Sequence, residues 1–179
     1  MRSTMMHDEA MDFLWLGVMI ERLGQTARTL DMHHHIRGAA EAQQQPLLQS
    51  ALWLSLLRAC SGFEAYMRKQ QGRVSGESVI AFLLFENRFP RSLRYCLRSA
   101  LGLVKRLPST GNRGIADARK RLDALDHWLD NQEKAGLPSS EHALLTRIVD
   151  ETGAACGELQ GGLEGEDPAP APATQAQSQ

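Results

Sequence analysis

Residues 13–31 read FLWLGVMIERLGQTARTLD, and this stretch decides the fold class. Its apolar side chains recur every three or four residues without an intervening proline, which is the period of a single buried helix face. The residues on this face are Phe13, Leu16, Ile20, Leu23, Ala27 and Leu30. The acids Asp8, Glu9 and Asp12 come just before, where they favour the positive end of a helix dipole. The pattern predicts one long helix over residues 8–35.

Further segments with the helical period follow downstream. Pro46 suits the first turn of a second helix, which we expect to run to Gln71 and to end at Gly72. The apolar run 79–85 follows Ser75, an expected N-cap, and fits either a buried helix or a strand. We predict a helix, because the sequence offers no second strand to pair with it. Additional helices are predicted over residues 90–107, opened by Pro90, and over 112–134 and 139–159. The predicted fold is therefore an all-α antiparallel bundle of five or six helices.

The last sixteen residues differ in composition from the rest of the chain. Residues 164–179 read EGEDPAPAPATQAQSQ and are predicted to be a disordered tail, because they contain no large apolar side chain. Residues 1–163 then fit one domain, since one core serves about 100–200 residues. Hydrophobic residues make up 42% and charged residues 23% of the chain, which excludes a wholly disordered protein. No apolar run approaches the roughly 20 residues that span a bilayer, so we predict a cytoplasmic protein without membrane contact.

Signatures of catalysis and of cofactor binding are missing from the sequence. It contains no glycine-rich phosphate loop, no HExxH and no GxSxG pattern. The cysteines Cys60, Cys96 and Cys156 lack CxxC spacing, and we interpret them as small buried hydrophobic residues. The histidines at positions 33–35 point in different directions on a helix and are interpreted as cations at its C-terminal end, while His142 adds no metal-ligand spacing. We therefore predict no metal site and no cofactor, and leave catalytic residues unassigned.

Charge is distributed unevenly along the chain, although the net charge is only −1. Residues 58–121 hold fourteen Lys and Arg against four acids, an excess of ten positive charges. Either this basic middle pairs with acids elsewhere in the fold, or it binds an anionic partner. The acids for the first explanation lie near the N-terminus and at Asp123, Asp126, Asp130 and Glu133. A nucleic-acid partner is not favoured, because the pI is 6.6 and aromatic residues do not alternate with the basic ones.

A charged pair, Glu21-Arg22, interrupts the first predicted helix. Helical periodicity places Glu21 on one face with Gly17, Gly24 and Arg28. The two glycines would let a second helix or a ligand approach Glu21 closely. The alternative is that the pair forms a structural ion pair or belongs to a solvated helix surface.

A row of arginines follows the apolar run, at Arg88, Arg91, Arg94 and Arg98. Spacings of three and four put the last three on one stripe of a helix, which is an arrangement that can hold an extended anion or several carboxylates. Because like charges repel, we expect a negative group nearby, such as a partner surface, a phosphate or Glu21. The alternative is a solvated polar face.

Three blocks of the sequence, in order, resemble the alpha-E domain family, a bacterial all-helical family named for its Glu-Arg motif. The first block is residues 13–31, with Gly17, the Glu-Arg pair and Thr-Ala-Arg. The second contains Trp53 and the segment 63–66. The third, 82–97, reads FLLFENRFPRSLRYCL and is similar to the family's Phe-Pro-Arg-Ser segment. The resemblance carries over as signature positions Glu21, Arg22, Arg28, Phe89, Pro90, Arg91 and Ser92.

The resemblance also implies a size for the complete domain. The family's full domain is about twice as long as this chain and has two related halves, of which this chain resembles the later, C-terminal one. The chain is then a naturally short member, a fragment of a longer protein, or a half that a partner or second copy completes. A homodimer is expected, because a half-length member would otherwise expose an apolar face.

The family context leads to a functional hypothesis. Family members occur beside or fused to ATP-grasp-type ligases and transglutaminase-like peptidases, which implies a non-catalytic accessory protein that binds such an enzyme or its acidic peptide. The alternatives are an enzyme of the same pathway, with Glu21 as general acid or base and arginines clamping an anionic substrate, or a degenerate fragment. The predicted site residues are Glu21, Arg22, Arg28, Arg88, Arg91, Ser92, Arg94 and Arg98.

Overall fold

The computed structural model describes residues 9–42, 46–71, 73–108, 112–136 and 141–164. Seven α-helices and no strands are found in these ranges. In chain order they are α1 (Glu9–Ala42), α2 (Pro46–Ala59), α3 (Phe63–Gln70), α4 (Gly76–Phe85), α5 (Leu93–Val104), α6 (Arg113–Ala135) and α7 (Glu141–Glu164). The predicted all-α bundle is confirmed, with one helix more than the larger predicted number.

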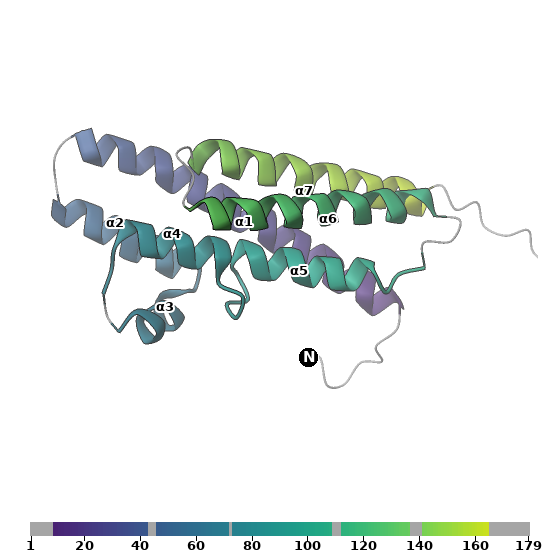
Figure 1. Ribbon diagram of the computed structural model, residues 1–179, viewed down its shortest axis with the longest axis horizontal. Coiled ribbons are helices and arrows are strands. Elements are labelled where there is room, and N and C mark those ends of the chain that lie inside the picture. The colour runs from purple at the N-terminus through teal and green to yellow at the C-terminus, as the bar shows by residue number, and fades with distance from the viewer. Residues whose placement is uncertain (1–8, 43–45, 72, 109–111, 137–140, 165–179) are drawn as a thin grey trace, which may run out of the picture.

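Four helices form the centre of the bundle. Helix α1 packs against both α5 and α7, and α6 packs against the same two helices. Figure 1 shows α5, α6 and α7 side by side along the long axis, with α1 crossing behind them and α3 projecting from one edge. Helices α1 and α5 run antiparallel, because Asp12 near the start of α1 pairs with Arg106 after the end of α5, while Thr26 contacts Arg91 before its start.

The core consists of the apolar faces that the helical period predicts. Leu16, Leu23 and Ala27 of α1 are almost completely buried, and residues 79–85 of α4 are buried apart from the half-buried Ala81. The burial of α4 explains why residues 79–85 have no polar stripe, since α2 and α5 pack against this helix. The prediction of a helix over residues 79–85 is confirmed. Ser75 is its N-cap, as predicted, and accepts a hydrogen bond from the Ser78 amide.

The single helix predicted over residues 46–71 is wrong, because the chain breaks between α2 and α3. Ser61 adopts the left-handed conformation with φ 54°, and the Gly62 amide donates to the Leu57 carbonyl at 2.7 Å. A Cβ at Gly62 would lie only 3.0 Å from the ring of Phe89. The glycine lets this turn pack directly against aromatic side chains.

Two other helix boundaries differ from the predictions. Helix α5 begins at Leu93 instead of Pro90, because Ser92 is its N-cap and accepts a hydrogen bond from the Tyr95 amide at 3.0 Å. Helix α1 continues past the histidines to Ala42, through alanines of high helix propensity. The histidines at 33–35 therefore lie inside the helix, so the prediction that they cap its C-terminal end is wrong.

At the C-terminal side, α7 includes Glu164, where the predicted tail begins, and the rest of that tail lies outside the described residues. Within the described ranges, none of the helices combines the length and the apolar character needed to cross a membrane.

Candidate functional site

Basic residues of α5 are bound to carboxylates of α6. Arg94 is only 2% exposed and pairs with Asp130 and Glu133, and its guanidinium also donates to the Leu129 carbonyl at 3.3 Å. Arg98 contacts Asp126 at 3.4 Å and Asp130 at 3.1 Å. Lys105 pairs in the same way with Asp123. The explanation in which the basic middle pairs with acids inside the fold is confirmed at these positions. Arg94 and Arg98 therefore hold α5 to α6.

The two residues of the Glu-Arg pair in α1 lie in different environments. Glu21 is exposed, whereas Arg22 is half-buried and, together with Arg91, places positive charge near the thiol of Cys96. The hydroxyl of Thr26 donates to the carbonyl oxygen of Arg91 at 3.1 Å. The structure thus brings the α1 signature stretch into contact with the Phe-Pro-Arg-Ser turn.

The buried thiols beside these arginines are not nucleophiles at neutral pH. Burial raises the pKa of Cys96 to about 11, despite the opposing charges of Arg22 and Arg91. Burial likewise raises the pKa of Cys60 to about 11, with Arg91 opposing it. A thiol with such a pKa stays protonated, and only the thiolate attacks.

The glycine-lined face of α1 is exposed at Gly17, whereas Gly24 is buried beside the side chain of Arg28. A Cβ at Gly17 would meet nothing within 4 Å. The guanidinium of Arg28 folds back along the helix, so that its Nη1 would lie 3.2 Å from a Cβ at Gly24. Glu21 and Arg28 are both exposed on this face. They are separated from Arg94 and Arg98, which point to α6.

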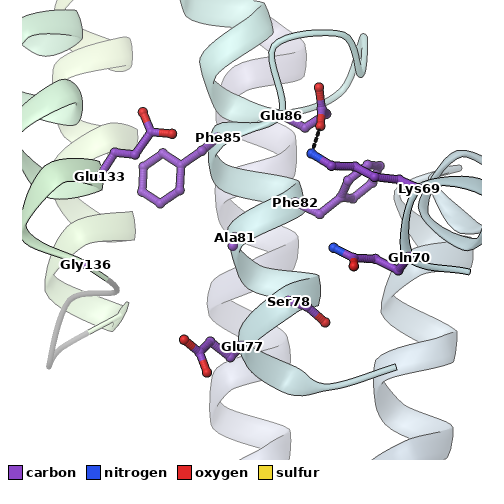
Figure 2. Close-up of a pocket in the computed structure, with 10 residues that line it drawn as sticks. All are labelled: Lys69, Gln70, Glu77, Ser78, Ala81, Phe82, Phe85, Glu86, Glu133 and Gly136. Carbon is purple, nitrogen blue, oxygen red and sulfur yellow. Dashed lines mark hydrogen bonds and ion pairs between the residues drawn. The ribbon is translucent and has the colours of Figure 1, made fainter. Parts of the chain in front are cut away.

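A groove lies between α3, α4 and the end of α6. It consists of two adjoining hollows of about 360 Å³ and about 680 Å³, which share Lys69, Phe82 and Glu86. Figure 2 shows the first hollow, with Lys69 on one side, Glu133 on the other and the aromatic rings of α4 between them. The groove therefore has an apolar floor and a charged rim.

The larger hollow carries an excess of positive charge. Arg68, Lys69 and Arg88 line it against one acid, Glu86. Lys69 pairs with Glu86, whose carboxylate also accepts a hydrogen bond from the Arg88 amide at 3.0 Å. The hydrogen bond from Lys69 lowers the pKa of Glu86 more than its partial burial raises it. The side chains of Arg68 and Arg88 are exposed at the rim, where an anionic ligand can reach them.

The predicted site residues thus fall into separate places. Arg88 lines the groove, and Ser92 is a buried N-cap whose hydroxyl donates to the Glu86 carbonyl at 2.6 Å. Sequence reasoning missed Arg68 and Lys69. The two adjacent basic residues can be read in the sequence, but nothing in the sequence shows that they lie beside the Phe89 segment.

Comparison with known proteins places the chain in a family. The uncharacterized protein Rv2567 of Mycobacterium tuberculosis and the uncharacterized protein Mb2597 of Mycobacterium bovis are each 26% identical to it over 178 aligned residues, covering 90% of this chain. The chain spans only 19% of the length of these relatives. No solved structure matches it. The alpha-E family, described as a predicted alpha-helical domain with a conserved ER motif, matches residues 1–162. The chain therefore belongs to the alpha-E family.

Proposed function

We propose that this alpha-E domain is a non-catalytic binding module whose groove takes an acidic peptide segment. The observation that carries the proposal is the pairing of an aromatic floor with a basic rim at one surface. The acidic segment belongs to an ATP-grasp-type ligase or a transglutaminase-like enzyme, or to the peptide substrate that such an enzyme modifies. This partner class comes from the family resemblance.

The charge of the rim supports an anionic ligand. Lys69 is already neutralised by Glu86. Arg68 and Arg88 have no carboxylate of the described residues in ion-pair contact with their guanidinium groups. Two exposed guanidinium groups at one hollow can each bind a carboxylate in a bidentate manner.

The floor of the groove supports a peptide over a small anion. Phe82 and Phe89 stack with ring centroids 4.8 Å apart and line the larger hollow together with Ala65. Phe82 and Phe89 are largely buried, so apolar side chains of a ligand would cover the edges of these rings together with the half-buried Ala65, while its acids contact the rim. An acidic peptide with interspersed apolar residues fits both parts.

Two observations favour binding over catalysis. Cys60 and Cys96 are protonated at neutral pH. Of the arginines that the enzymatic alternative places around Glu21, Arg94 and Arg98 bind carboxylates of α6 instead. Among the described residues, neither these two thiols nor Arg94 and Arg98 therefore support the enzymatic alternative.

Fluorescence anisotropy tests peptide binding. The probe is a labelled peptide in which Glu alternates with Leu, and its control is the same peptide with Gln in place of Glu. We expect saturable binding of the acidic probe alone, and a loss of at least about tenfold in affinity for Arg88→Glu and for Arg68→Glu, because each reversal removes one charged contact.

A matched charge reversal distinguishes binding in the groove from a general effect of the protein's net charge. Arg119→Glu changes an exposed arginine of α6, which lies about 20 Å along that helix from Glu133 at the groove. This variant should bind like the wild type. Equal losses in all three variants would mean that the probe responds only to net charge, and the groove proposal would be rejected.

Photocrosslinking in the native host tests the partner class. A photoreactive amino acid at position 88 should capture an ATP-grasp-type or transglutaminase-like polypeptide, whereas the same group at position 119 should not. Capture of the same proteins from both positions, or of neither enzyme class from position 88, contradicts the proposed partner.

A further inference from the structure

Three potential metal ligands meet where α1 passes the start of α7. Asp31 and His35 lie one helical turn apart on α1, and His142 is the second residue of α7. His142 Nδ1 lies 2.6 Å from Asp31 Oδ1, and His35 Nε2 lies 3.8 Å from Asp31 Oδ2. One ligand atom from each of the three side chains lies within 4.8 Å of the other two.

The sequence did not predict this site, because its members are far apart along the chain. His142 is separated from Asp31 by 111 positions. Only the i,i+4 spacing of Asp31 and His35 is readable in the sequence, and it is the spacing at which two helical side chains share one face. The fold supplies the third ligand by packing α7 against α1.

The geometry suits a tetrahedral zinc ion. Zinc binds histidine nitrogen and carboxylate oxygen at about 2.0–2.2 Å, so neighbouring ligand atoms around it lie roughly 3.3 Å apart. The separations of 2.6 Å and 3.8 Å run to different oxygens of Asp31, and rotation of the exposed side chains of His35 and His142 can bring both nitrogens around one ion. Two imidazoles and one carboxylate are ligands that zinc accepts, with a fourth position left for water.

The surrounding charges favour a cation. Glu141 lies next to His142 in the chain and contacts His34 Nδ1 at 3.3 Å. The ring of His34 stacks on that of His142 with centroids 6.5 Å apart. Among the described residues in contact with this cluster, the cation is Arg37, which is engaged by Glu141 at 3.4 Å and by the face of Trp53 at 5.2 Å. At these contacts, two carboxylates therefore stand against one guanidinium.

We propose that Asp31, His35 and His142 bind one zinc ion, which fastens the start of α7 to the middle of α1. The ion acts as a clip, because its ligands come from two helices that are distant in sequence. Since the bound state exists only when both helices are docked, zinc binding stabilises the folded protein. The site is independent of the groove between α3 and α4.

Calorimetry of tag-free protein with zinc chloride, after treatment with a chelator, tests the site. We expect one zinc ion per chain and a rise in melting temperature on adding zinc. His142→Gln and His35→Gln should each lower the affinity at least tenfold, because losing a direct ligand costs no less than the about tenfold loss typical of a second-shell change. Circular dichroism of the two variants verifies that they fold.

A third variant supplies the matched control. His127→Gln removes an exposed histidine of α6 whose ring contacts the Asp123 carbonyl, and it should bind zinc like the wild type. The proposal is overturned if zinc shows no saturable binding, or if the three variants bind it equally. It is also overturned if His142→Gln lowers stability without zinc and leaves zinc affinity unchanged, which would make His142 an ion-pair partner of Asp31 only.

Discussion

Arg94 is the residue on which the contact between α5 and α6 depends most. It is buried, and it binds Asp130 and Glu133 as well as a backbone carbonyl. We expect Arg94→Met to lower the free energy of unfolding by about 2 kcal/mol, because it removes buried charged hydrogen bonds and leaves the Leu129 carbonyl without this donor, although Asp130 keeps its contact with Arg98. Urea denaturation followed by circular dichroism measures this change.

Arg98 provides the comparison for Arg94, since it contacts the same Asp130 from an exposed position. Arg98→Met should cost only about 0.5 kcal/mol, because water screens ion pairs at the surface. Equal costs for the two variants would mean that burial does not set the strength of this network.

Glu86, at the groove, makes the stability of the folded protein depend on pH. Its pKa is lowered from 4.5 in the folded protein, chiefly by the hydrogen bond from Lys69. A lowered pKa contributes stability that is complete above the unfolded value and is lost as the pH falls below about 4.5. We expect Glu86→Gln to cost about 1 kcal/mol at pH 7. The difference from wild type should shrink between pH 5 and pH 3 in urea titrations, and a constant difference would contradict the assignment.

At the scale of helices, α6 and α7 approach each other through glycine. A Cβ at Gly114 would lie 2.7 Å from the backbone of Gly162 and closer still to the Glu158 carbonyl. Gly114→Ala should therefore push the two helices apart and cost about 2 kcal/mol, as overpacked sites do. Thermal unfolding measures the effect.

The control for this substitution lies on α7 itself. A Cβ at Gly157 would meet nothing within 4 Å. Gly157→Ala should stabilise the protein by about 0.5–1 kcal/mol, because alanine has the higher helix propensity. If both alanines stabilise the protein, the close approach at Gly114 has no energetic consequence.

Local sequence signals explain which helices could be predicted. The helical period identifies α4 and α6 to within a few residues, with Ser75 as the predicted cap of α4. The break at Ser61 was missed although Ser61-Gly62 is a dipeptide typical of turns, because the apolar helical period continues across it to Phe63 and Tyr66. Pro90 was mistaken for a first-turn residue, since the hydrogen bonds of Ser92 two positions later decide where α5 starts.

At the scale of the whole molecule, contacts between segments distant in sequence form the groove and the proposed zinc site. These contacts were the least predictable feature. The basic excess and its acidic counterpart were both visible in the sequence, so their pairing could be foreseen. The groove could not, because it needs α3 and the Phe89 turn to lie side by side, and the sequence does not show which distant segments meet. The meeting of Asp31 with His142 depends in the same way on the packing of α7 on α1.

The homodimer expected from the sequence stays a prediction, and the exposed face of α1 gives it a definite form. Leu14 and Met32 are 56% and 64% exposed, and Ile36 is 47% exposed. Together with Gly17, Glu21 and Arg28 they form one stripe along α1. We call this stripe the α1 outer face.

The α1 outer face is complementary to itself when two copies run antiparallel. With a two-fold axis near Gly24, Glu21 lies opposite Arg28 of the partner subunit. The same register places Met32 of the partner subunit over Gly17, where a Cβ would find nothing within 4 Å. A large side chain thus meets an open position and a carboxylate meets a guanidinium, as an isologous interface requires.

Charge swapping across this axis tests the dimer by sedimentation velocity at several concentrations. We expect the wild type to dimerise, and Glu21→Arg or Arg28→Glu alone to shift it to monomer, because each brings like charges together twice per dimer. The double variant restores opposite charges and should dimerise again. A monomeric wild type at every concentration contradicts the prediction. So does a folded double variant that stays monomeric, because the restored charges should allow dimerisation. Single variants that dimerise like the wild type also contradict it, since a dimer through any other face would not respond to either reversal.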